Sequence, residues 1–183
     1  MKSRTIVIRN TGEGFADAQK ETELAAEGIL TPKETRQLCL VTEEMLSLVR
    51  SVSGDLNAEF FIESEEKEFT LHLMSRQTLG NTQRNELIRS STTGQNEASK
   101  GFLGKLREIY EAAMSVGADV DRYYNESGSQ SQAADITDTV IAEPKWDRLE
   151  RSVLLSLADD VKIGIRRHLV ELTVVKDFGA GEA

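Results

Sequence analysis

The segment from Thr31 to Ser53 constrains the fold more than any other part of this sequence. Thr31-Pro-Lys-Glu34 has the form of a capping box with proline at the first helical position, which marks the start of a helix. Behind it, apolar residues recur at steps of three and four and therefore share one side of the helix: Leu38, Val41, Met45, Leu48, Val49 and Val52. Gly54 ends the pattern. The spacing predicts a helix over 31–53 that packs on the core.

Two short segments with strand-like composition, residues 58–63 and 68–75, follow this helix. The polar residues between them predict a turn, so the pair predicts a β-hairpin. Because side chains alternate between the two faces of a strand, one face collects apolar residues and the other is expected to be largely exposed to water. His72 falls on the face that is expected to be exposed.

The remaining segments complete a mixed order of strands and helices. Residues 5–9 predict an opening strand, and residues 161–166 and 169–175 predict a closing hairpin. Helices are predicted at residues 15–26, 81–88 and 98–115, and between Pro144 and Asp159. A polar insertion is expected at about 118–140 within one domain covering residues 1–183. Because the strands come in adjacent pairs, the sequence predicts an α+β fold: a two-layer α/β sandwich with a largely antiparallel mixed sheet and helices on one face.

Charge and composition exclude several classes of function. The chain has 22 Lys and Arg against 31 Asp and Glu, and a net charge of −9 disfavours binding to nucleic acid or to an anionic membrane. A single cysteine, Cys39, excludes an internal disulfide, and two histidines leave little basis for a zinc site. No apolar run approaches the roughly 18 residues of a membrane span, and no signal peptide is evident. We expect a cytoplasmic protein.

The stretch Leu40-Val-Thr-Glu-Glu-Met-Leu-Ser-Leu-Val-Arg50 resembles the first core helix of the histidine-kinase-like ATPases (GHKL or Bergerat fold). The most similar members are the bacterial anti-sigma-factor serine kinases, whose signature there is two acids, any residue, an aliphatic residue, Ser or Thr, and Asn. The element order and the last strand, Val170-Glu-Leu-Thr-Val-Val-Lys176, also resemble that family. The resemblance implies a Bergerat-like fold, ATP or another nucleotide as ligand, and a protein partner.

In that family the glutamate positions the attacking water or hydroxyl, and the asparagine four residues later binds Mg²⁺. Two alignments place an acid four residues before the metal position: Glu43 with Ser47, or Glu44 with Leu48. Helical geometry favours Glu44 with Leu48, because these two flank the apolar stripe where a pocket between helix and sheet would lie. Leucine has no oxygen with which to bind Mg²⁺, and the other alignment leaves only a serine hydroxyl, so no metal is expected.

The other two signatures of the family are altered as well. The adenine-reading motif Asp-x-Gly-x-Gly corresponds to residues 71–80, which contain no aspartate, and Ser75 or Gln77 could accept the hydrogen bond instead. A segment at the expected start of a helix loosely resembles the phosphate-binding loop of the family. The positive end of the helix dipole favours anions at such a position. The residues that carry this resemblance are Lys100, Gly101, Gly104 and Lys105.

Three functional hypotheses follow from these observations. The first is a degenerate member of the family that regulates a protein partner, with weak or lost nucleotide binding and with dimers expected from the resemblance. The second is an active ATP-dependent serine kinase or ATPase that uses Glu44 as its catalytic residue. The third is a binding module without a small ligand, which the acidic surface and the polar insertion favour. An alternative interpretation of Glu43 and Glu44 is that they form a solvated helix face. The missing magnesium ligand favours the first hypothesis, a protein that is not an enzyme.

Overall fold

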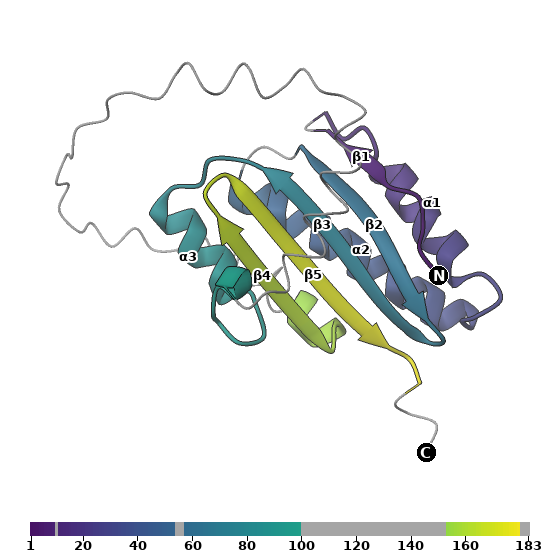
Figure 1. The fold of residues 1–183 in the computed structure, drawn as a ribbon. Helices are drawn as coiled ribbons and strands as arrows, with labels where there is room; N and C mark the ends of the chain where they lie inside the picture. The colour runs from purple at the N-terminus through teal and green to yellow at the C-terminus, as the bar shows by residue number, and fades with distance from the viewer. Residues whose placement is uncertain (10, 54–56, 100–152, 180–183) are drawn as a thin grey trace, which may run out of the picture.

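A five-stranded antiparallel sheet forms one layer of the molecule (Figure 1). The computed structural model describes residues 1–9, 11–53, 57–99 and 153–179. Within these residues the strands are β1 (Ile6–Ile8), β2 (Ala58–Glu65), β3 (Glu68–Arg76), β4 (Asp160–Arg166) and β5 (Leu169–Asp177). They lie in the order β1-β2-β3-β5-β4, and every neighbouring pair is antiparallel. Both predicted hairpins are therefore present and lie side by side, joined through β3 and β5.

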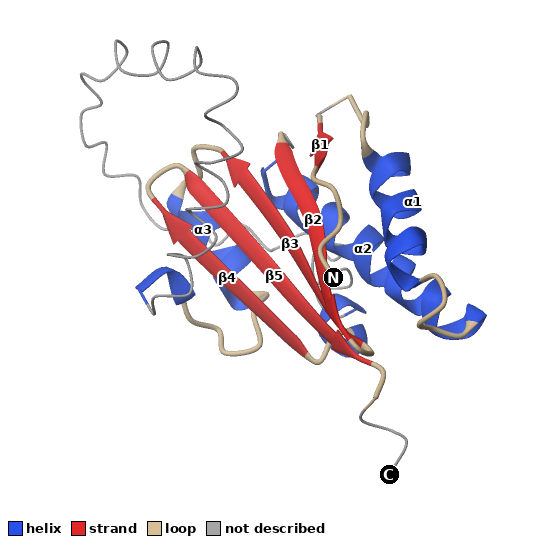
Figure 2. Ribbon diagram, turned by 45° about the vertical axis from the view of Figure 1, so that its right-hand side comes forward, coloured by secondary structure: helices blue, strands red, loops and turns tan. Residues whose placement is uncertain are grey.

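The three longer helices of the described residues form the second layer. They are α1 (Phe15–Ala26), α2 (Pro32–Ser53) and α3 (Asn81–Arg89), and a short 3₁₀ turn, η1 (Glu97–Ser99), lies beside β4. Figures 1 and 2 show α2 running across one side of the sheet, with α1 beside it. This arrangement confirms the prediction of an α+β, two-layer α/β sandwich.

The start of α2 is fixed by the predicted capping box. The Thr31 backbone N–H donates to the Glu34 carboxylate at 2.7 Å, and the Glu34 N–H donates to the Thr31 hydroxyl at 3.4 Å. The Thr31 hydroxyl also donates to the Glu34 carboxylate at 2.6 Å. This bond and the one from the Thr31 backbone N–H lower the pKa of Glu34. All six residues of the predicted apolar stripe are at most 7% exposed, so the predicted face of α2 is the face that packs on the sheet.

The two hairpin turns contain two residues each, and the β2–β3 turn is shorter than its polar composition predicted. β2 continues to Glu65, which pairs with Glu68, and only Glu66 and Lys67 form the turn. Glu66 has φ of 51° and Arg167, in the other turn, has φ of 55°. A left-handed residue lets a two-residue turn follow the twist of the flanking strands. His168 lies in the second turn, as predicted.

The face of the sheet opposite α2 is not exposed to water along its centre. We call it the outer face and define it by five side chains that are at most 4% exposed: Phe61, His72, Met74, Glu171 and Thr173. The prediction that His72 is exposed was therefore wrong. Phe61 and Met74 are apolar and point to this side, because they share it with His72 in the register of β2 and β3. The run Phe60-Phe61-Ile62 thus supplies apolar side chains to both faces of the sheet.

A polar loop covers the free edge of β4. The Asn96 side chain accepts from the Ile165 N–H and donates to the Ile165 carbonyl, both at 2.9 Å. The Thr92 hydroxyl accepts from the Val161 N–H at 2.8 Å, and the Thr92 N–H donates to the Val161 carbonyl at 2.8 Å. These bonds occupy backbone groups that an edge strand otherwise offers to another chain.

Several predicted features lie outside the described residues. They are nearly all of the helix at 98–115, the insertion at about 118–140 and the first part of the helix after Pro144. Residues 153–157 are helical, and Leu154 is fully buried there. Among the described residues, none of the helices is both long and apolar enough to span a bilayer.

Candidate functional site

The residues predicted on α2 divide between the surface and the core. Glu43 is exposed, and Glu44 and Ser47 are half-buried. Leu48 is only 2% exposed and belongs to the hydrophobic core that joins α2 to the sheet. The expectation that Leu48 borders a pocket is therefore not met, because its side chain packs among apolar neighbours.

Ser75 and Gln77, the two predicted adenine-binding residues near the end of β3, differ in the hydrogen bonds that their side chains make. Ser75 is buried, and its hydroxyl donates to the Asn57 carbonyl at 2.7 Å. The Gln77 backbone N–H donates to the His168 carbonyl at 2.8 Å, which ties the end of β3 to the β4–β5 turn. The amide of the Gln77 side chain is buried, and neither its nitrogen nor its oxygen has a hydrogen-bond partner in residues 1–9, 11–53, 57–99 and 153–179. Of the two, Gln77 therefore retains an unused donor and an unused acceptor.

Hydrogen bonds hold the segment after Gln77 against the end of α2. The Gln83 side chain donates to the Val52 carbonyl at 2.8 Å and accepts from the Gly80 N–H at 3.0 Å. This places the start of α3 at the C-terminal end of α2. Glu44 lies eight residues before Val52 along the helix, or about 12 Å. The remaining predicted residues, Lys100, Gly101, Gly104 and Lys105, lie outside the described part of the chain.

The outer face contains a buried histidine that contacts three neighbours. The His72 ring stacks on Phe61 with centroids 4.6 Å apart and planes at 18°. Its Nδ1 is 3.4 Å from the Thr173 hydroxyl, and its Nε2 is 3.5 Å from a Glu63 carboxylate oxygen without making a hydrogen bond. Burial lowers the pKa of His72 to about 4, against the opposing effect of Glu63. The imidazole is therefore neutral at pH 7.

A buried glutamate lies diagonally across from this histidine. Glu171 pairs with Met74 on β3 and with Gly164 on β4, and its residue is 3% exposed. Both carboxylate oxygens are buried, and within the described part of the chain neither has a hydrogen-bond partner. Burial disfavours the charged form and raises the pKa of Glu171 to about 7. Sequence reasoning missed this residue, because a polar residue in an alternating strand is typical of a solvated face.

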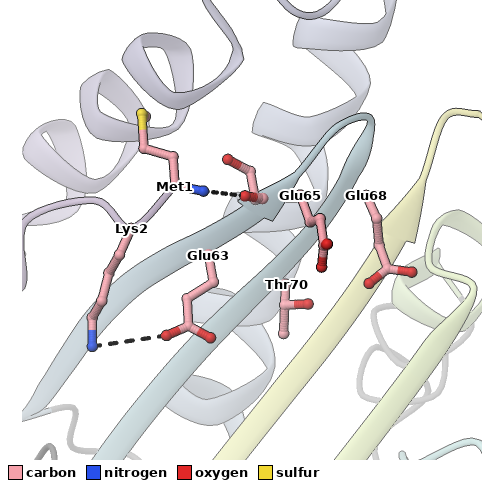
Figure 3. A pocket seen from close by; sticks show the side chains of 7 residues that line it. Met1, Lys2, Glu63, Glu65, Glu68 and Thr70 are labelled. Atoms are coloured by element: carbon pink, nitrogen blue, oxygen red, sulfur yellow. Dashed lines mark hydrogen bonds and ion pairs between the residues drawn. The ribbon is translucent and has the colours of Figure 1, made fainter.

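Two open hollows lie elsewhere on the described surface. One, of about 440 Å³, lies at the β2–β3 hairpin, where Lys2 Nζ is 3.8 Å from a Glu63 oxygen and Glu65 and Glu68 lie nearby (Figure 3). The other, of about 600 Å³, lies between the end of α1 and the start of α2. Neither is lined by Glu44, Leu48 or Gln77. Within the described residues, no group of three or more His, Cys, Asp or Glu side chains could hold a metal ion.

Comparisons with known proteins do not assign the chain to a family. No family model matches the sequence, and no curated protein matches it. The functional argument therefore depends on the fold and on the residues that it brings together.

Proposed function

We propose that this chain is a degenerate domain of the histidine-kinase-like ATPase type that regulates a protein partner and uses no metal ion. The observation that carries the proposal is the position of Leu48. In the alignment favoured by helical geometry, Leu48 replaces the magnesium-binding asparagine, and its side chain lies in the apolar core at 2% exposure. A metal ligand at this position would need an oxygen that faces a cleft.

The chemistry of phosphoryl transfer explains why this replacement opposes catalysis. The transition state spreads negative charge over the transferred phosphoryl group, and catalysis consists mainly of positioning and of stabilising that charge. Glu44 can orient a nucleophile, but it adds negative charge near the phosphates. Without Mg²⁺ or another cation, Glu44 alone does not supply the stabilisation that a kinase or ATPase requires.

Weak nucleotide binding without metal is compatible with Gln77. Its side chain offers one acceptor and one donor in a plane, and the amide has no hydrogen-bond partner among the described residues. An adenine edge presents an amino donor beside a ring-nitrogen acceptor, which matches an amide in two parallel hydrogen bonds. Gln77 lies in the stretch 71–80, which corresponds to the adenine-reading motif of the resembling family.

A thermal-shift experiment tests this proposal. A ligand that binds the native state raises the melting temperature by mass action. We expect millimolar ATP or ADP to give a small shift that is the same with Mg²⁺ and with EDTA, and no phosphate release. Gln77→Ala should remove the shift, whereas Gln95→Ala, at an exposed glutamine in a loop, should keep it.

Two results would contradict the proposal. A shift that requires Mg²⁺, together with ATP turnover that Glu44→Gln abolishes, would establish the alternative, an active serine kinase or ATPase. The absence of any shift with adenine or guanine nucleotides would remove the nucleotide part and leave a binding module without a small ligand.

A further inference from the structure

The carboxylate of Glu171 is an uncompensated polar group. Both of its oxygens are buried, neither accepts a hydrogen bond from a described residue, and the residue is 3% exposed. A buried carboxylate without partners is costly, and buried polar atoms in proteins are nearly always hydrogen-bonded. The described helices lie on the other face of the sheet, so α1, α2 and α3 do not supply a donor. A group of this kind is a candidate for binding a donor from outside.

Arg76 on β3 and Arg166 on β4 lie in the row next to Glu171 on this face, and both residues are exposed. Two lysines on this side of the sheet contact other acids. Lys162 lies two residues before Gly164 on β4, and its ammonium contacts Asp160 at 2.9 Å. Lys2 contacts Glu63 at 3.8 Å. The pKa of Glu171 is raised by burial alone, with no opposing effect from a nearby cation. The carboxylate is therefore not part of an ion pair within the described residues.

We propose that Glu171 binds the guanidinium group of an arginine side chain supplied by a partner protein. An arginine presents two parallel N–H donors, which match the two unpaired oxygens of one carboxylate. Guanidinium is also more weakly hydrated than an ammonium group, so it enters an apolar environment at lower cost. Charge complementarity supports the same ligand, because the chain carries a net charge of −9.

The neighbours of Glu171 suit a flat cation. Gly164 lies directly across on β4 and carries no side chain. Met74 lies directly across on β3, and Phe61 and His72 follow in the next row of the sheet. Guanidinium planes pack well against sulfur, aromatic and imidazole groups of this kind. Because Glu171 is buried, surrounding side chains must move before the arginine enters, and association should be slower than a diffusion-limited encounter.

This inference deepens the proposed function by naming the chemistry of the partner, and it uses the face of the sheet opposite the predicted nucleotide site. The two proposals can fail separately. Metal-dependent ATP turnover would remove the proposed function and leave the titration of Glu171 unaffected. A normal titration of Glu171 would remove the arginine site and leave the nucleotide result unaffected.

The test is an NMR titration of the side-chain carboxyl carbons of the full chain labelled with ¹³C-glutamate. The probe is the peptide acetyl-Ser-Leu-Arg-Leu-Ser-amide, and the control peptide carries neutral citrulline in place of arginine. We expect Glu171 to titrate near pH 7 in the free chain and its midpoint to fall by more than one pH unit with the arginine peptide. Citrulline should leave the midpoint unchanged.

Variants on the same face provide the matched control. Glu171→Gln assigns the resonance and should abolish binding of the arginine peptide, whereas Glu59→Gln, at a half-buried acid on the same face, should not. Three results would overturn the inference. The first is a midpoint below pH 5 in the free chain, which would mean that the chain already pairs this carboxylate. The second is a midpoint that the arginine peptide does not move. The third is peptide binding that survives Glu171→Gln.

Discussion

His72 and Thr173 lie opposite each other on β3 and β5, and the imidazole Nδ1 is 3.4 Å from the Thr173 hydroxyl. This pair places a neutral imidazole in the middle of the outer face, one row away from Glu171. The two titratable side chains are perturbed in opposite directions by the same cause. Burial disfavours the charged form of each, so the pKa of the histidine falls and that of the glutamate rises. Their effects on stability consequently oppose each other over a shared range of pH.

We first predict that Glu171→Gln reveals a loss of stability at low pH. In this variant Glu171 no longer titrates and His72 keeps its large shift. The unfolded histidine takes up a proton below its ordinary pKa of 6.5, while the folded one does not until about 4. The unfolded state therefore binds more protons in this window, and the free energy of unfolding falls as the pH is lowered from 6.5 to 4. Urea unfolding at intervals of half a pH unit measures the slope. A flat profile would show that His72 is not buried in its neutral form.

We also predict that His72→Gln reveals the opposite slope. Glu171 then remains, with its pKa raised from 4.5 to about 7 in the folded state. Between these values the folded state holds a proton that the unfolded state has lost, so the free energy of unfolding decreases as the pH rises, by about 1 to 3 kcal/mol in total. The parent chain should be nearly flat between pH 4.5 and 6.5, where the two slopes cancel. A parent profile as steep as either variant would contradict this account.

The Leu48 side chain should be required for stability. Leu48→Ala removes buried methyl groups from the core and should lower the free energy of unfolding by about 2 to 5 kcal/mol. Leu48→Asn should cost at least as much, because it also buries an amide without partners. Ser47→Ala, at the half-buried neighbouring position, should change the free energy of unfolding by less than about 0.5 kcal/mol. Unfolding in urea measures all three, and a stable Leu48→Asn variant that binds Mg²⁺ would place the residue at a cleft.

Local sequence patterns predicted most of the fold, because they follow from local geometry. The capping box of Thr31 and Glu34 and the three-to-four spacing behind them were sufficient to predict α2 to within a residue. The alternation in β2 and β3 predicted their pairing, but it could not show which polar positions are covered. Burial of His72 and Glu171 depends on packing across strands that are distant in sequence. The Asn96–Ile165 hydrogen bonds, which span 69 positions, were equally invisible to any local pattern.

The capping box itself can be tested at its hydroxyl. Thr31→Ala removes the acceptor for the Glu34 N–H and should lower the free energy of unfolding by about 1 kcal/mol. Lys33→Ala, at an exposed residue in the same turn, provides the control and should have little effect. Circular dichroism at 222 nm during urea unfolding measures both variants. Equal midpoints would show that other contacts alone fix the start of α2.

Asn96 should protect the edge of the sheet as well as stabilise it. Asn96→Ala leaves the N–H and the carbonyl of Ile165 without their side-chain partner, and each lost bond to a buried group costs about 1 to 3 kcal/mol. The uncovered groups also form an edge that pairs with another chain, so the variant should form oligomers that increase with protein concentration. Gln95→Ala changes an exposed neighbour and should remain as stable and as monodisperse as the parent chain. Urea unfolding and light scattering across a concentration series measure the two effects. If Asn96→Ala loses stability but does not associate beyond the parent chain, other residues must protect the β4 edge.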